Sequence, residues 1–218
     1  MDKSFNYIIS PDISEFRRFT PKLKIGVLAS GKGTNFQELI NLSEKGELDI
    51  EIKVLITNKE DAGCIKRAKN GGIPHKLISG KDFSRKELFE LEIINTLNNY
   101  DVELVVMAGW MKIVTPFFIN KFKNKIINIH PSLLPAYKGG SAIKDSILNG
   151  SKITGCSVHF VEEEVDSGSL IMQAALPILN EDNIDTLSKK IQILEHKILP
   201  HSISHAGFLI RNNFMENY

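Results

Sequence analysis

LKIGVLASGKGTN, residues 23–35, is the stretch that decides the fold. Its apolar, β-branched first half predicts a buried strand over residues 23–30, and a helix is expected to begin at Asn35. The sequence SGKGTN places two glycines between the strand and the helix. A strand, a glycine-containing turn and a helix in this order form the first unit of an α/β fold with a parallel sheet.

The same alternation continues to residue 130. Further strands are predicted at residues 49–58, 74–79, 102–109 and 125–130. Helices are expected at residues 35–45, 62–70, 85–99 and 116–123. Runs such as VELVVMAG are apolar on both faces, which is typical of a parallel strand buried between two layers of helices.

The pattern changes after residue 130. We expect a short helix at 142–149, then two strand-like runs, TGCSVHFVE and SLIMQAALPI, and a long final helix over about 184–201. The predicted fold class is therefore α/β, with an open, doubly wound and mostly parallel sheet that ends in an antiparallel pair of strands. In such sheets, ligands bind beyond the carboxyl ends of the strands, where the strand order reverses.

The composition is that of one globular domain. The 218 residues are 42% hydrophobic and 24% charged, which allows a sizeable core. Residues 1–21 are interpreted as an N-terminal extension whose role the sequence does not indicate, and residues 22–218 as a single domain. The formal charge of +1 argues against nucleic acid binding through bulk charge.

Several features predict a cytoplasmic protein. Cys64 and Cys156 have no CxxC partner, which fits a reducing compartment better than a disulfide or a zinc site. The first 21 residues read neither as a signal nor as a transit peptide, and no apolar run approaches the roughly 18 residues of a membrane span. We expect no membrane partner and no metal, because His201 and His205 lack the Glu of an HExxH site and are interpreted as an exposed helix pair.

The SGKGTN loop is a candidate phosphate site. Glycines let backbone N–H groups approach an anion, and the following helix adds its positive end. A dinucleotide fingerprint fails because Phe36 replaces its third glycine, and a P-loop fails because Gly33 replaces the hydroxyl that binds magnesium. We therefore favour a single monophosphate, with a plain strand-to-helix turn as the alternative.

The run KIINIHPSLLPAYKGG, residues 125–140, carries the candidate catalytic pair. Asn128 and His130 are two residues apart at a strand end, so both face one side of the sheet at the ligand-binding edge. Two such donors could hold an oxyanion as a carbonyl becomes tetrahedral. The alternative is an Asn that caps the turn and a His that is satisfied structurally.

A carboxylate for the imidazole is offered by the loop EEEVDSG. Asp166 near His130 would raise the pKa of the imidazole and could pass a proton, although a plain turn is an equal interpretation. The neighbouring Glu162–Glu164 are typical of a solvated face. His159 lies on the strand that leads to this loop, so it either lines the pocket or packs in the core.

Three motifs together resemble a known family. SGKGTN, INIHPSLLPAYKG and TGCSVHFVEEEVDSG, in this order and spacing, are similar to those of the phosphoribosylglycinamide formyltransferases, a branch of the folate-dependent formyltransferase family. The resemblance covers about residues 24–210 and implies a Rossmann-like formyltransferase fold. It also implies transfer of a formyl group from 10-formyltetrahydrofolate to the amine of N1-(5-phosphoribosyl)glycinamide, giving formylglycinamide ribonucleotide and tetrahydrofolate in purine biosynthesis.

The resemblance also assigns roles to residues. His130 would be the proton donor, Asp166 would raise its pKa, and Asn128 would help to hold the oxyanion. The substrate phosphate would bind Gly33, Thr34 and Asn35. On the last helix, the ribonucleotide would contact Gln192, Ile193, Leu194 and Glu195. The folate would contact Arg85, Met111, Lys112, Ile113, Val114, Asn128, Glu162, Glu163, Glu164, Val165 and Asp166. The phosphate-binding half would span about residues 22–122, and the folate and catalytic half about 123–210. The enzyme would use no metal and would be a monomer or a homodimer.

Two positions depart from the family pattern. Lys112 stands where an Arg is frequent, and Gly140-Ser141-Ala142 replaces a segment that often carries a His. Trp110 is expected to pack beneath the folate segment rather than to stack on the ligand.

Rival functions remain open at this stage. A 10-formyltetrahydrofolate hydrolase would share the Asn, His and Asp set but usually carries an extra N-terminal domain, for which residues 1–21 are too short. Transferases acting on methionyl-tRNA or sugar nucleotides usually have a further C-terminal domain, whereas this sequence stops at Tyr218. A non-enzymatic nucleotide-binding module would need only the SGKGTN loop.

Overall fold

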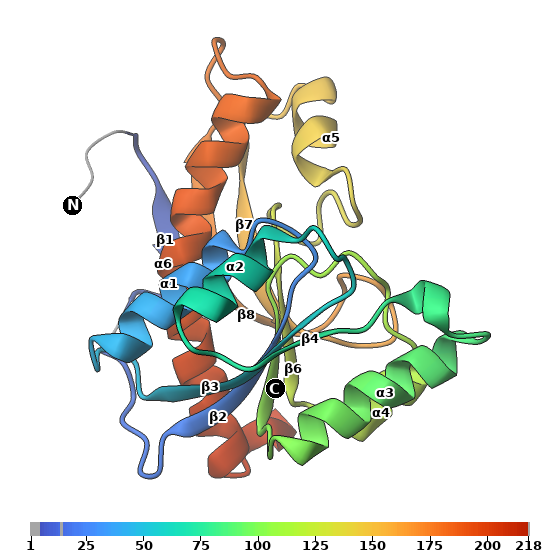
Figure 1. The fold of residues 1–218 in the computed structure, drawn as a ribbon. Helices are drawn as coiled ribbons and strands as arrows, with labels where there is room; N and C mark the ends of the chain where they lie inside the picture. Colours follow the sequence, from blue (N-terminus) through green and yellow to red (C-terminus); the bar gives the residue numbers. More distant parts are fainter. Residues whose placement is uncertain (1–4, 14, 218) are drawn as a thin grey trace.

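A computed structural model of the chain describes residues 5–13 and 15–217. They form one twisted eight-stranded sheet with helices on both faces (Figure 1). The strands are β1 (Ile8–Ser10), β2 (Leu23–Leu28), β3 (Ile50–Thr57), β4 (His75–Leu77), β5 (Leu104–Met107), β6 (Ile126–His130), β7 (Ile153–Phe160) and β8 (Leu170–Pro177). The helices are α1 (Thr34–Glu44), α2 (Gly63–Asn70), α3 (Lys86–Asn99), α4 (Pro116–Lys121), α5 (Ala142–Leu148) and α6 (Ile184–Arg211), with short 3-10 turns at Gly80–Asp82 and Phe214–Asn217.

The strand order is β1-β8-β7-β6-β5-β2-β3-β4, with β2 to β6 parallel to one another. The chain runs from β2 outward to β4, then crosses back to β5 on the other side of β2, so the order reverses between β2 and β5. Strands β7 and β8 continue the sheet in antiparallel pairing. The predicted doubly wound, mostly parallel sheet with an antiparallel C-terminal strand pair is confirmed.

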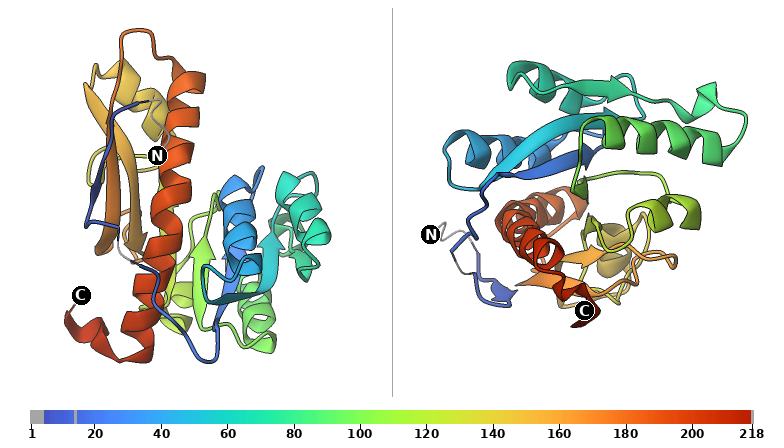
Figure 2. Two further views of the ribbon diagram at one scale, coloured as in Figure 1. Left: turned by 90° about the vertical axis from the view of Figure 1, so that its left-hand side faces the viewer. Right: turned by 90° about the horizontal axis from the view of Figure 1, so that it is seen from below.

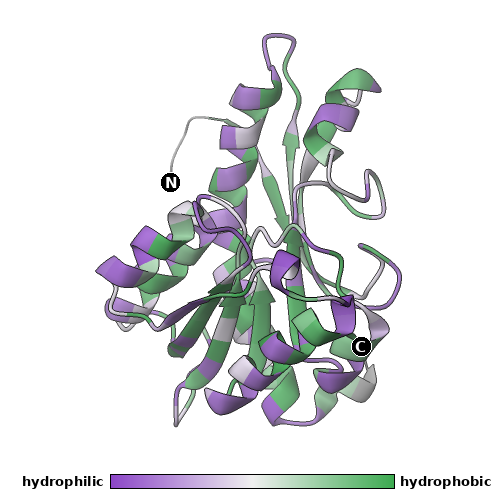
Figure 3. Cartoon of the chain, turned by 45° about the vertical axis from the view of Figure 1, so that its right-hand side comes forward, coloured by the Kyte–Doolittle hydropathy of each residue, from purple (hydrophilic) through white to green (hydrophobic). Residues whose placement is uncertain are grey.

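Two helix layers bury the two faces of the sheet. Side chains alternate across each strand, so that Leu55 packs with α1, α2 and α6, whereas the next residue, Ile56, packs with α3 and α4. Figure 2 shows α6 running along one face and α3 along the other. The apolar strands lie between helices whose outer surfaces are hydrophilic (Figure 3). Among the described residues, no helix combines the length and apolar character required to cross a membrane.

Helix α6 is longer than predicted. The sequence indicated an end near residue 201, but the helix continues to Arg211 through Pro200. Proline lacks a backbone N–H and so removes one helical hydrogen bond. The helix continues because Ile203, Ala206 and Leu209 are buried in the core beyond that point, and their burial outweighs the lost bond.

The N-terminal extension packs against the domain, which the sequence did not predict. Strand β1 pairs antiparallel with β8, with Ile9 opposite Ala174, and so extends the sheet at its edge. Phe19 is buried in the core cluster that includes α6. Residues 1–4 and 14 of the extension lie outside the described residues.

Candidate active site

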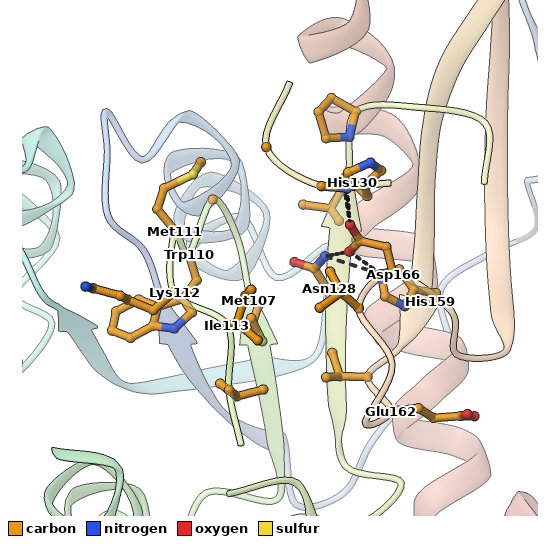
Figure 4. A pocket seen from close by; sticks show the side chains of 18 of the residues that line it. Met107, Trp110, Met111, Lys112, Ile113, Asn128, His130, His159, Glu162 and Asp166 are labelled. Atoms are coloured by element: carbon orange, nitrogen blue, oxygen red, sulfur yellow. Dashed lines mark hydrogen bonds and ion pairs between the residues drawn. The ribbon is translucent and has the colours of Figure 1, made fainter. Parts of the chain in front are cut away.

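A cavity of about 260 Å³ opens beyond the carboxyl ends of β5 and β6. Its walls come from the segment after β5, the end of β6, the loop after β7 and the glycines that precede α5 (Figure 4). The cavity is adjacent to the point where the strand order reverses, which is where this type of sheet binds its ligands.

Asn128 and His130 both line this cavity from the last residues of β6. The intervening Ile129 points to the opposite face, into the core that contains α6. The i, i+2 spacing therefore places the amide and the imidazole on one face, as predicted from the strand period.

Asp166 joins this pair from the loop after β7. Its Oδ2 lies 3.3 Å from Nδ1 of His130, and its Oδ1 lies 3.5 Å from Nδ2 of Asn128. The backbone N–H of Gly139 donates to Oδ2 at 2.8 Å. The structure thus brings together the three residues that the sequence indicated as catalytic.

The loop that carries Asp166 is closed by a position that only glycine can occupy. A Cβ atom on Gly168 would lie 1.9 Å from the carbonyl oxygen of Phe160, so any side chain there would force the loop away from the strand. Asp166 itself has a positive φ of 50°, which Asp tolerates better than most residues. The D-x-G spacing is therefore a steric requirement of the loop that aims Asp166 at His130.

Electrostatics keep Asp166 ionised. Burial alone would raise the pKa of this carboxyl, but hydrogen bonds from His159 and from the Gly139 N–H, together with the neighbouring imidazoles, lower it to about 2. The side chain of His130 is 7% exposed and that of Asp166 is 10% exposed. A fixed negative charge thus faces the imidazole in a nearly dry environment.

His159 is the residue of this cluster that sequence reasoning did not assign to the site. It pairs across the sheet with Asn128 in the β6–β7 register, and its Nε2 lies 3.2 Å from Nδ2 of Asn128. Its Nδ1 donates to the carbonyl oxygen of Phe160 at 2.7 Å, and its Nε2 also lies 3.6 Å from Oδ1 of Asp166. His159 is buried and also lines the cavity, so both expected interpretations apply.

The Nε2 atom of His130 is covered by the loop between β6 and α5. It lies 2.8 Å from the carbonyl oxygen of Tyr137, which can only accept, so Nε2 carries a proton. This contact has no signal in the sequence, because the acceptor belongs to the backbone and its position depends on the loop conformation. The loop itself is held by Ser157, which accepts from the Leu134 N–H at 3.0 Å.

The segment after β5 forms the wall opposite Asn128 (Figure 4). Met111, Lys112, Ile113 and Val114 all line the cavity, as do Glu162, Glu163 and Val165 on the far loop. Two residues expected to contact folate do not line it. Glu164 pairs instead with Lys138 at 2.7 Å, and Arg85 is exposed at the N-cap of α3.

The SGKGTN loop has the geometry of an anion site. Gly33 caps α1 with φ +69°, and a Cβ atom there would lie 2.6 Å from Cβ of Cys64. The first helical bond runs from Gln37 N–H to the Gly33 carbonyl, which leaves the preceding N–H groups of the first turn without a helical acceptor. The loop touches the cavity wall, since Ser30 accepts from the Met111 N–H at 3.0 Å.

Helix α6 contacts this loop through two of the residues that were expected to bind the ribonucleotide. Gln192 donates to Oγ1 of Thr34 at 2.7 Å, and Asn35 donates to Oε2 of Glu195 at 2.9 Å. Burial raises the pKa of Glu195, and the hydrogen bond from Asn35 offsets this only in part. Leu194 is fully buried in the core, and Ile193 is half-buried with no polar contact to the loop, so these two lie apart from the cluster.

The remaining candidates have structural surroundings. Cys64 and Cys156 are free thiols, both buried, and Trp110 is buried against Phe89. The His201–His205 pair was expected to be exposed, which is wrong: both are half-buried, because the extension covers α6 and Phe16 stacks on His201 with ring centroids 4.2 Å apart. Within residues 5–13 and 15–217, no group of three or more His, Cys, Asp or Glu residues could hold a metal ion.

Comparisons with known proteins give one consistent result. The formyl transferase family model matches residues 23–203. The chain is 42% identical over 177 residues to phosphoribosylglycinamide formyltransferase of Haemophilus influenzae, covering 81% of this chain and 84% of that protein. The crystal structure of phosphoribosylglycinamide formyltransferase from Bacillus halodurans matches with a TM-score of 0.81 and 37% identity, covering 84% of this chain and 94% of that one.

A longer relative is also similar. The trifunctional purine biosynthetic protein adenosine-3 of Chironomus tentans is 41% identical over 185 residues, which is 84% of this chain but 14% of that protein. The chain therefore corresponds to a small part of the trifunctional relatives.

Proposed function

Because the chain belongs to the formyl transferase family, we propose that it transfers the formyl group of 10-formyltetrahydrofolate to the amine of N1-(5-phosphoribosyl)glycinamide. The products are formylglycinamide ribonucleotide and tetrahydrofolate, and the reaction is a step of purine biosynthesis. The observation that carries the proposal is the convergence of Asn128, His130 and Asp166 on one cavity that adjoins the SGKGTN loop.

The two substrates enter from two sides. The phosphate of the ribonucleotide binds the N–H groups of Gly33, Thr34 and Asn35, where the helix dipole of α1 favours an anion. The ribose lies toward Gln192 and Glu195, which already contact that loop. The glycinamide chain then points along Ser30 and Met111 toward the cavity.

The folate occupies the cavity between the segment after β5 and the loop after β7. Met111, Ile113 and Val165 supply apolar walls. These residues are 68%, 64% and 39% exposed, respectively, so a flat ring system would bury them. Arg85 and Glu164 lie outside the lining, and we assign them to the part of the folate that extends beyond the cavity. The formyl carbon is then placed against Asn128 and His130.

Formyl transfer needs hydrogen-bond donors that stabilise the oxyanion and a proton donor for the leaving nitrogen. The glycinamide amine attacks the formyl carbon, and the tetrahedral oxyanion is stabilised by N–H donors from Asn128 and His130. The intermediate collapses by breaking the bond between the formyl carbon and the tetrahydrofolate nitrogen, which takes the Nε2 proton of His130. The proton that the attacking amine loses then returns to Nε2, so His130 ends in its starting state. Because the Nε2 proton is hydrogen-bonded to the Tyr137 carbonyl, the substrates have to displace this contact before transfer.

Asn128 has a further constraint. Its Nδ2 atom faces His159 and Asp166, while its carbonyl oxygen points into the cavity (Figure 4). An amide nitrogen has two hydrogens and both face these partners, so at least one of the two contacts has to be given up before Nδ2 can donate to the substrate. Rotation of the amide on substrate binding is therefore part of the proposed mechanism.

Asp166 orients and supports the imidazole. Its ionised carboxylate faces Nδ1 of His130, so it stabilises the imidazolium and leaves Nε2 as the atom that exchanges protons with the substrates. The Gly139 N–H holds the same oxygen at 2.8 Å, which fixes the direction of the carboxylate. The mechanism uses proton transfer by these side chains and 10-formyltetrahydrofolate as the formyl donor.

Partners and location are proposals of the same kind. The free thiols of Cys64 and Cys156 accord with a reducing compartment, and we assign the enzyme to the cytoplasm. It acts on small molecules rather than on nucleic acid, as a monomer or a homodimer. The domain is proposed to divide near residue 122, with phosphate binding before this point and folate binding and catalysis after it.

One assay tests the function. Purified protein is mixed with glycinamide ribonucleotide and 10-formyltetrahydrofolate, and tetrahydrofolate release is followed with and without the ribonucleotide. Ribonucleotide-dependent release together with the formylated product is the expected result. Release that is independent of the ribonucleotide would identify a hydrolase, and binding without release would identify a nucleotide-binding module.

A further inference from the structure

Glu90 is a carboxylate in the core that the mechanism above does not use. It lies on α3, is 1% exposed, and is next in sequence to Phe89, which belongs to the core cluster of the α3 and α4 layer. A buried carboxylate costs free energy unless hydrogen bonds compensate it. In this apolar layer, Glu90 therefore requires hydrogen-bond donors close to its carboxyl group.

The partner is Thr115, at the end of the cavity wall. Glu90 Oε1 accepts the backbone N–H of Thr115 at 2.8 Å, and Oε2 accepts the Thr115 hydroxyl in a short contact. Both acceptor atoms of the carboxylate are thus used by one residue.

Thr115 follows directly after the residues that line the cavity. The wall segment, residues 110–115, is held at its other end by Ser30, which accepts the Met111 N–H at 3.0 Å. Between these two anchors, the side chains of Met111, Lys112 and Ile113 are exposed and pack little against the protein. Val114 packs against the core cluster of the α3 and α4 layer, and the exposed part of the wall segment is positioned by its two ends.

Trp110 strengthens the link between the wall segment and α3. Its ring stacks on Phe89 at a centroid distance of 6.3 Å and an interplanar angle of 5°, and it is 7% exposed. Phe89 and Glu90 are consecutive, so α3 contacts the wall segment at both Trp110 and Thr115. Trp110 is the one tryptophan of the sequence, so its fluorescence reports on the wall segment alone.

We propose that Glu90 is a positioning residue for the folate side of the cavity. It fixes Thr115 and so holds the wall segment at its distance from Asn128 across the cavity. Ser30 is the second anchor and connects the wall segment to the phosphate loop. The identity of the ligand rests on the proposed function, whereas the anchoring of the wall segment does not.

The test compares variants that differ in the Glu90–Thr115 contact. Glu90→Ala removes both acceptors, whereas Glu90→Gln keeps one acceptor oxygen and the side-chain volume. Glu92→Ala is the matched control, because Glu92 lies on the same helix but pairs with Lys76 at the surface. Thr115→Val removes the hydroxyl alone and serves if Glu90→Ala does not fold.

The first measurement is Trp110 fluorescence without substrate. Glu90→Ala should shift the emission to longer wavelength and increase quenching by acrylamide, with a smaller change in Thr115→Val and none in Glu92→Ala. Equal acrylamide quenching in Glu90→Ala and Glu92→Ala would overturn the anchoring. If Glu90→Ala does not fold, wild-type emission and quenching in Thr115→Val would overturn it. This measurement needs no substrate and holds even if the wild-type protein shows no formyl transfer. Failure of the anchoring proposal can therefore be distinguished from failure of the proposed function.

The second measurement separates positioning from stability. Loss of both hydrogen bonds to Thr115 predicts that Glu90→Ala raises the KM for 10-formyltetrahydrofolate about tenfold or more. The KM for the ribonucleotide should change less than about threefold, and Glu90→Gln should recover most of the folate KM. A lower melting temperature with both KM values unchanged would reduce Glu90 to a structural role and overturn the proposal.

Discussion

Oδ2 of Asp166 lies 3.3 Å from Nδ1 of His130. His130 ends strand β6, whereas Asp166 lies in the loop after β7, 36 residues later in the sequence. The same oxygen accepts the Gly139 N–H, which belongs to the loop that covers Nε2 of His130. One carboxylate therefore contacts both the imidazole and the loop above it. Its removal is expected to affect the orientation of the His130 ring and the position of this loop together.

His130→Ala and Asn128→Ala should each lower kcat about 100-fold or more, since loss of one oxyanion donor typically costs this much. Neither side chain belongs to the apolar core, so both variants should keep the wild-type circular dichroism spectrum. Wild-type turnover in both variants would exclude the proposed roles.

Asp166→Asn should abolish most turnover and alter the pH–rate profile, because the amide cannot stabilise an imidazolium as a carboxylate does. The pKa of Asp166 is lowered from 3.8 to about 2, so its charge stabilises the fold above pH 3.8, and this contribution is lost as the pH falls through about 2. Denaturant titrations should show wild type more stable than the variant by roughly 2 kcal/mol at neutral pH, with the gap closing in acid. A gap that stays constant with pH would argue against the ion pair.

Gly33→Ala should destabilise the protein by roughly 1–3 kcal/mol and weaken ribonucleotide binding, because the new Cβ would need a positive φ and would meet Cβ of Cys64 at 2.6 Å. Gly31→Ala is the control in the same loop, since a Cβ atom there meets nothing within 4 Å. Calorimetric titration with the ribonucleotide and thermal melts of both variants test this. Equal behaviour of the two variants would contradict the steric argument.

Glu195→Gln should stabilise the protein at neutral pH while it weakens the ribonucleotide contact. The pKa of Glu195 is raised above 4.5 by burial, so the wild-type fold is favoured by protonation below that value and loses this contribution as the pH rises through the folded-state pKa. The Gln side chain is always neutral and can still accept from Asn35. The stability difference should therefore grow as the pH rises above about 4.5, and a difference independent of pH would refute the assignment.

Phe19→Ala should lower the free energy of unfolding by roughly 3 kcal/mol, since Phe19 is 7% exposed and fills the core beside α6. Ile13→Ala is the control in the same extension, because Ile13 is 44% exposed and should change stability by less than about 0.5 kcal/mol. Urea unfolding measures both. A neutral Phe19→Ala would show that the extension contributes little to the fold.

The fold was predictable where local pattern decides it. Apolar β-branched runs separated by amphipathic stretches indicated β2 to β8 and the helices between them, since strand and helix periods are properties of the nearest residues. Strand β1 was missed because three residues carry no period, and it forms only because the edge of β8 offers unpaired backbone groups. The end of α6 was misplaced because burial of Ile203 and Leu209 outweighs the local effect of Pro200.

The site divides in the same way. The sequence alone determined that Asn128 and His130 share one face at a strand end. It also determined that the SGKGTN loop and the loop that carries Asp166 contain glycines, because strand alternation and backbone sterics are local. Only the tertiary structure decided that His159 sits across from Asn128, that the Tyr137 carbonyl holds Nε2 of His130, and that Glu90 anchors Thr115. These contacts join segments that are distant in sequence or depend on a loop conformation, and they are set by strand register and core packing, which no local pattern of residues contains.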